Sequence, residues 1–201
     1  MKKLLLLIAG IFACISLSAQ TAEEYLDKVI EKMKSYNDIS IMFNVRVTDE
    51  NNHSTTSSGY ASIKGDSYII NLDAEEVICN GKTRWNYIIP DEEVTVSDAT
   101  DGFSPISIIE TFKENTTMSF IENNDENTKK IEIKENKDDL FEKIQITIDK
   151  DLKINRVYIF MADGYKLFYE ITDFKTNQNL PDNMFIFNEA IHPNVEVIDM
   201  R

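Results

Sequence analysis

The sequence predicts an α+β protein that is mostly β, with about eleven short strands in one antiparallel sheet and two helices. Apolar and polar residues alternate over many short runs, which is the pattern of strands with one buried face. Turn residues separate these runs at hairpin spacing, and helical spacing occurs in only two clear places. A single antiparallel sheet of this size must curl or close, and the two helices can cover its apolar face.

The first predicted helix spans residues 21–36, where apolar residues recur at helical spacing. Thr21 followed by Glu24 forms a capping-box pattern at its start. The second spans residues 104–113, with Ser104 as the cap and Pro105 at the first helical position. One face of this second helix carries three large apolar side chains, Ile106, Ile109 and Phe112.

The predicted strands follow the period-two alternation and are bounded by turn residues. Asn80-Gly81 and Asp163-Gly164 are the strongest hairpin signals. The expected strands cover residues 39–48, 58–64, 67–73, 76–79, 83–89, 93–97, 116–122, 129–134, 141–149, 154–162 and 165–174, with a short strand at 184–187 and a further candidate at 195–199.

Residues 1–19 have the features of a secretory signal peptide. Lys2 and Lys3 form a positive start, an apolar run follows, and Ser18-Ala19 supplies small residues for cleavage. We therefore expect a periplasmic protein with a signal peptide at 1–19 and one domain at 20–201.

Two alternatives to ordinary cleavage remain open. One is a signal anchor, although the apolar run is short for a membrane span. The other is lipoprotein processing at Cys14, where the bulky Phe12 makes a poor lipidation motif.

Length and composition exclude several classes of protein. The 201 residues allow one domain, and the 42% hydrophobic share argues against disorder. The net charge is -14, and cleavage at Ala19 would remove two lysines and make it -16, so a nucleic-acid partner is not expected. Cleavage would also leave Cys79, in an apolar setting, as the only thiol, which predicts a buried and inert cysteine.

No motif in the sequence predicts catalysis, a metal site or a cofactor. The chain has no phosphate-binding loop, no G-x-S-x-G and no H-E-x-x-H sequence. His53 and His192 lie in polar or near-terminal contexts, which is typical of surface histidines. We therefore expect a non-enzyme with no catalytic residue, metal or cofactor, and keep an unrecognised secreted enzyme as a weak alternative.

Several segments together carry a family resemblance. Residues 77–87 read VICNGKTRWNY, and Ser104-Pro105, Leu180-Pro181 and residues 185–187 follow in order. In this respect the chain resembles the LolA-like family of periplasmic outer-membrane lipoprotein carriers. The resemblance implies a strongly curved, unclosed antiparallel β-barrel, with helices forming a lid over a hydrophobic cavity.

The resemblance also implies a function. Such a chaperone binds the acyl chains of lipoproteins in its cavity and moves them from the inner to the outer membrane. Free passage of acyl chains through water is prohibitive, because each exposed methylene costs ~0.8 kcal/mol. The expected partners are acylated lipoproteins or lipids, an inner-membrane releasing transporter and an outer-membrane acceptor, and we expect a monomer. The alternative is a related lipid-binding or envelope-stress-sensing domain with the same fold.

Candidate cavity residues come from the apolar faces of the strands and from the second helix. They are Phe43, Val45, Ile63, Tyr68, Ile70, Trp85, Tyr87, Ile106, Ile109, Phe112, Ile144, Ile146, Ile159, Met161 and Tyr169. The family's Lys-Arg-Pro after the second strand, whose Arg ties the lid to the sheet, is replaced here by Lys64-Gly65-Asp66. Arg46, Lys64 and Arg84 are the candidates to replace that Arg.

Overall fold

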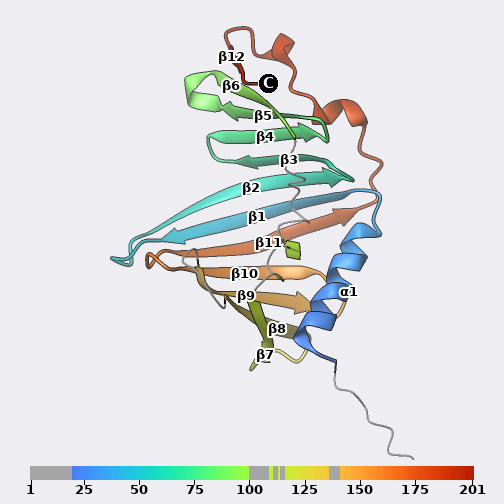
Figure 1. Ribbon diagram of the computed structural model, residues 1–201, viewed down its shortest axis with the longest axis vertical. Helices are drawn as coiled ribbons and strands as arrows, with labels where there is room; N and C mark the ends of the chain where they lie inside the picture. The colour runs from blue at the N-terminus through green and yellow to red at the C-terminus, as the bar shows by residue number, and fades with distance from the viewer. Residues whose placement is uncertain (1–19, 100–108, 111–112, 114–115, 136–140) are drawn as a thin grey trace, which may run out of the picture.

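The computed structural model describes residues 20–99, 109–110, 113, 116–135 and 141–201 of the chain. These residues form a single curved, unclosed sheet of twelve strands with one α-helix against one of its faces (Figure 1). The expected signal peptide and most of the second predicted helix lie outside the described residues.

Helix α1, Ala22–Lys34, begins at the predicted capping box. The backbone N–H of Glu24 donates to Thr21 Oγ1, and the N–H of Thr21 donates to the Glu24 carboxylate, both at 3.1 Å. These two bonds satisfy donors that the first turn of a helix leaves unpaired. Leu26 and Val29 are fully buried, so the apolar stripe of the helix faces the sheet.

The strands occupy nearly the predicted segments. They are β1 (Ile39–Thr48), β2 (Ser54–Lys64), β3 (Ser67–Leu72), β4 (Glu75–Asn80), β5 (Thr83–Ile88), β6 (Glu93–Asp98), β7 (Thr116–Ile121), β8 (Thr128–Glu135), β9 (Phe141–Asp149), β10 (Ile154–Met161), β11 (Lys166–Thr176) and β12 (Glu196–Asp199). The described residues also form three short 3-10 helices, η1 (Ile89–Asp91), η2 (Asp182–Phe185) and η3 (Glu189–Ile191).

The sheet order is β12-β6-β5-β4-β3-β2-β1-β11-β10-β9-β8-β7. Neighbouring strands are antiparallel except β12, which pairs in parallel with β6. The long connection from β6 to β7 takes the chain to the opposite edge, and β11 then returns beside β1 (Figure 1). The sheet is therefore built of two meanders that meet at the β1–β11 pair.

Two sequence predictions need correction. Residues 184–187 are not a strand: η2 covers Asp182–Phe185, and Phe185 and Phe187 are buried as anchors against the sheet. The purely antiparallel sheet of about eleven strands is a twelve-stranded sheet with one parallel pair at its edge.

The sheet has an apolar core on each face. We call the side that packs on α1 the α1 face and the opposite side the outer face. The core on the α1 face joins the helix to β1–β4 and β8–β9, whereas the core on the outer face lies between β3–β6 and the segment that follows β11. The latter segment, residues 177–195, is called the C-terminal segment below, and it runs along the sheet towards β12 (Figure 1).

A buried carboxylate begins the C-terminal segment. Asp38, only 1% exposed, accepts hydrogen bonds from the backbone N–H groups of Gln178 at 2.7 Å and Leu180 at 3.2 Å. Its own backbone carbonyl accepts from the N–H of Asn177 at 3.0 Å. These bonds hold the chain where it leaves β11, so that the residues beyond can reach the outer face.

Candidate functional site

The α1 face contains a sealed part and a partly open part. Beneath the helix, the isoleucines of β8 and β9 are almost wholly buried: Ile131, Ile133, Ile144, Ile146 and Ile148. On β1, β3, β4, β10 and β11, other large apolar side chains of the same face keep part of their surface exposed: Ile41, Ile70, Val77, Val157, Ile159, Met161 and Phe174. We call these seven residues the open strip.

Most of the predicted cavity residues share this face. The strand register and the core contacts place the following residues on it: Phe43, Val45, Ile63, Tyr68, Ile70, Ile144, Ile146, Ile159, Met161 and Tyr169. Ile70, Ile159, Met161 and Tyr169 are partly exposed and the others are buried. Only the partly exposed members can present surface to a ligand without rearrangement.

Phe43 depends on a glycine in the neighbouring strand. It lies directly opposite Gly59, and a Cβ on that glycine would come within 2.7 Å of the Phe43 ring. Real Cβ contacts are not this short, so only glycine lets the ring lie flat across β2. On its other side Phe43 contacts the ring of Tyr169, with ring centres 6.2 Å apart.

Trp85 and Tyr87 do not join the other predicted cavity residues. Trp85 pairs with Ile78, which pairs with Ile69, and this row belongs to the outer face. Tyr87 is buried in the same outer core, 5.3 Å from the ring of Phe187. The expectation that both residues line one surface with Tyr68 is therefore wrong. The row that contains Tyr68 continues through Cys79 to Arg84, and Trp85, the next residue, points to the opposite face.

The predicted lid helix is described at three positions only. Ile109 is partly buried against the core of the α1 face, whereas Ile106 and Phe112 lie outside the described residues. Two ion pairs of 2.5 Å join this segment to α1, from Lys34 to Glu110 and from Lys113 to Asp27. The hydrogen bond that the Lys113 ammonium donates to Asp27 raises the pKa of Lys113.

The three latch candidates lie in three different places. Arg46 is on the outer face, with its guanidinium 5.8 Å from the ring centre of Phe168. Lys64 donates to the backbone carbonyl of Leu180 at 2.7 Å and to Asp182 Oδ1 at 2.5 Å, so it fastens the C-terminal segment. Of the three, only Arg84 lies on the α1 face, where it is the cross-strand neighbour of Cys79 in the β4–β5 register.

Arg84 and the Tyr68 hydroxyl form a small polar cluster within the apolar α1 face. Tyr68, only 1% exposed, is the cross-strand neighbour of Cys79, and Arg84 hydrogen-bonds to the Tyr68 side chain. Burial raises the pKa of Tyr68 to about 12, although Arg84 opposes the shift. Tyr68 is therefore neutral at physiological pH, and Cys79 is buried beside it.

The ion pairs between α1 and the 109–113 segment were not predicted from the sequence. Charged side chains on two amphipathic helices can pair in many ways, so their spacing along the chain gives no signal. The outer core was missed as well, although Leu180, Phe185 and Phe187 were visible as apolar residues after a turn.

Over the described ranges, no helix is long and apolar enough to cross a membrane. In the same part of the chain, no group of three or more His, Cys, Asp or Glu side chains is arranged to hold a metal ion.

Comparison with known proteins identifies related sequences and folds. The family model of the outer membrane lipoprotein carrier protein LolA matches residues 70–188, more than half of the chain. No curated protein matches the chain in sequence.

Among solved structures, an uncharacterized conserved protein from Thermus thermophilus has a similar fold. Its TM-score is 0.60 at 12% sequence identity, and the match covers 89% of this chain and 98% of that one. A LolA superfamily protein from Nitrosomonas europaea gives a TM-score of 0.44 at 11% identity, covering 84% of this chain and 99% of that one. MucB, solved in complex with MucA, gives 0.42 at 9% identity, covering 83% and 60%.

Proposed function

We propose that this chain, which belongs to the LolA family of outer membrane lipoprotein carrier proteins, is a periplasmic carrier that binds acyl chains on its α1 face. In this proposal residues 1–19 are a cleaved signal peptide and residues 20–201 form a monomeric carrier domain. The cargo is an acylated lipoprotein, received from an inner-membrane releasing transporter and passed to an outer-membrane acceptor. The proposal assigns no catalytic step.

The open strip is the observation that carries this proposal. Its seven apolar side chains keep exposed surface on the face that also holds the main core. Apolar side chains that stay accessible together on one face support a binding site there. Because burial of each methylene contributes ~0.8 kcal/mol, even part of an acyl chain lying along this strip would be held firmly.

The segment around Ile109 supports a lid in the same proposal. Ile109 contacts the core of the α1 face, and the Lys34–Glu110 and Lys113–Asp27 ion pairs tie its surroundings to α1. All four charged side chains are partly exposed, so each pair is weak enough to open. We propose that these two ion pairs hold the lid closed, which is the role that the resemblance gives to the arginine of the family's Lys-Arg-Pro.

The alternative is a related lipid-binding or envelope-stress-sensing domain with the same fold. The position of Lys64 is the observation that favours it. Lys64 is the surviving part of the family's latch motif, and it binds the C-terminal segment on the outer face. A sensor would bind the same acyl chains but would not release them to an acceptor membrane.

Native mass spectrometry of the mature protein, purified from its host envelope, tests the proposal. A carrier is expected to appear with bound lipoprotein or acyl lipid, and loaded protein should then deliver labelled lipoprotein to outer-membrane vesicles. Binding without delivery would favour the sensing domain. Consistent absence of acyl cargo, together with no displaceable binding of a fluorescent fatty acid, would exclude both.

A further inference from the structure

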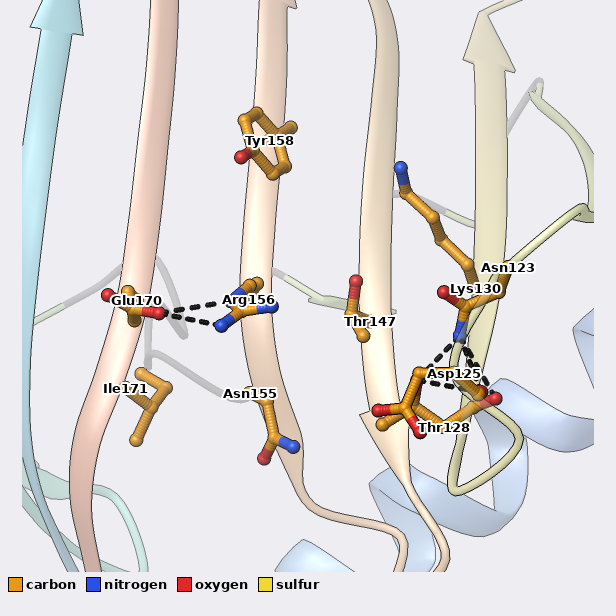
Figure 2. Close-up of a pocket in the computed structure, with 10 residues that line it drawn as sticks. All are labelled: Asn123, Asp125, Thr128, Lys130, Thr147, Asn155, Arg156, Tyr158, Glu170 and Ile171. Atoms are coloured by element: carbon orange, nitrogen blue, oxygen red, sulfur yellow. Dashed lines mark hydrogen bonds and ion pairs between the residues drawn. The ribbon is translucent and has the colours of Figure 1, made fainter.

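A pocket lies on the outer face of the sheet, over β8–β11 and the β7–β8 turn. It has a volume of about 540 Å³ and is predominantly polar. Figure 2 shows its lining: Asn123, Asp125, Thr128, Lys130, Thr147, Asn155, Arg156, Tyr158, Glu170 and Ile171. The sheet separates it from the open strip, because Val157 and Ile146, the neighbours of its lining residues along β10 and β9, belong to the α1 face.

The strand register explains why a depression forms here. Lys130, Thr147 and Arg156 occupy one row across β8, β9 and β10. Adjacent strands are about 4.8 Å apart, so the short threonine stands between two long side chains. Thr147, only 9% exposed, therefore forms the floor and its longer neighbours form the walls. Figure 2 shows Thr147 between Arg156 and Lys130.

Part of the lining is already paired within the protein. Arg156 binds Glu170 Oε1 through two of its nitrogens, each at 3.0 Å. The Asn123 amide donates to Asp125 and Thr128 within the β7–β8 turn, and Asp125 Oδ1 accepts from Asn127. These contacts give the pocket fixed walls.

Four other lining side chains have no such partner. Within the described part of the chain, no side-chain hydrogen bond or ion pair forms at Lys130, Thr147, Asn155 or Tyr158. The Lys130 ammonium instead lies 5.8 Å from the centre of the Tyr158 ring. An ammonium, two hydroxyls and an amide thus line one depression with hydrogen-bonding capacity unused.

We propose that this pocket binds the phosphate group of a polar ligand. All four side chains can donate hydrogen bonds, and a charge-assisted bond from a lysine to an anion is among the stronger kinds. A phosphate presents more acceptor oxygens than a carboxylate, so it can accept from Lys130 and from its cross-strand neighbour Thr147 together. Since the whole chain is strongly acidic, with a net charge of -14, anion affinity here requires a specific site.

The phosphate can come from two sources. It can belong to a soluble phosphate ester, or to the glycerophosphate headgroup of a membrane lipid. The second source would let an acidic protein dock on a lipid surface through one defined contact, without a basic face. The chemistry at Lys130 and Thr147 is the same in both cases.

Titration of the mature protein with sn-glycerol 3-phosphate, followed by backbone amide NMR shifts, tests the proposal. We expect saturable shifts centred on β8–β10, and none with glycerol. Lys130→Gln should weaken binding about tenfold or more, because it removes a hydrogen bond to a charged group. Thr147→Val should weaken it several-fold, while Lys134→Gln, on the same strand and face but outside the lining, should change it less than twofold.

Vesicles distinguish the two sources. Flotation with phosphatidylglycerol vesicles that is competed by glycerol 3-phosphate, and lost in Lys130→Gln, identifies a lipid headgroup. Saturable binding of the soluble ester without flotation identifies a free phosphate ester. The proposal is overturned if no saturable binding occurs, if Lys134→Gln weakens binding as much as Lys130→Gln, or if an acidic peptide binds there and phosphate does not. Fatty-acid binding should be unchanged in Lys130→Gln, so this result is independent of the carrier function.

Discussion

The two apolar cores of this protein have different covers. The core on the α1 face is covered by a regular helix that begins at a capping box and buries an apolar stripe. The core on the outer face is covered by the C-terminal segment. This segment is anchored by the buried rings of Phe185 and Phe187 and by hydrogen bonds to Lys64 and Asp38. Because β3 and β4 bury side chains towards both covers, the apolar residues of a strand do not by themselves identify its ligand-binding face.

The largest expected effect on stability comes from the core on the α1 face. Leu26 is fully buried between α1 and the sheet, so Leu26→Ala should lower the free energy of unfolding by about 3–5 kcal/mol. Urea denaturation measures this loss, and Lys28→Ala, at an exposed position on the same helix, is the control. A loss below about 1 kcal/mol, typical of a site outside the core, would show that α1 is not an integral cover.

Truncation in the outer core should have a more local effect. Phe185, only 1% exposed, anchors the C-terminal segment. Phe185→Ala should release that segment and reduce the hydrogen-exchange protection of β5 and β6, while α1 and β9 stay protected. Ile191→Ala, at a side chain that is 68% exposed, should leave the pattern unchanged. Equal loss of protection in β9 would mean that the two cores open together.

The smallest expected effect concerns Lys64. Its partner Asp182 has a side chain that is 90% exposed, so Lys64→Met should cost only about 0.2–1 kcal/mol, and less at high salt. Lys82→Met, at an exposed lysine, is the control. The release rate of a bound fatty acid should not change in Lys64→Met. A faster release would assign the lid latch to Lys64 instead of the ion pairs on α1.

Local signals were enough to predict much of the fold. The Thr21–Glu24 capping box and the hairpin at Asn80-Gly81 depend on neighbours a few residues away, and both are present. Gly81 has a φ of 82°, which is the conformation that favours glycine in such a turn. The alternation also placed Tyr68, Ile70 and Ile159 on one face, as expected.

Residues whose role depends on distant covers could not be predicted in this way. Trp85 and Tyr87 form the apolar side of β5, but that side is the outer face because residues one hundred positions later cover it. The Lys113–Asp27 pair depends on how the segment that contains Lys113 approaches α1, which neither segment specifies alone. Thr147 becomes a pocket floor only through its neighbours on two other strands.

The central claim is that acyl chains bind to the α1 face and not to the outer face. A comparison of fatty-acid binding between variants of the two faces tests it most directly. Ile159 belongs to the open strip, whereas Met42 is 56% exposed and lies on the outer face. The measurement is equilibrium binding of a displaceable fluorescent fatty acid to the mature protein, with the fold of each variant checked by circular dichroism. We predict that Ile159→Asp keeps the fold and loses most of the binding, while Met42→Asp binds like the wild type. Unchanged binding by a folded Ile159→Asp, or equal loss in both variants, would contradict it.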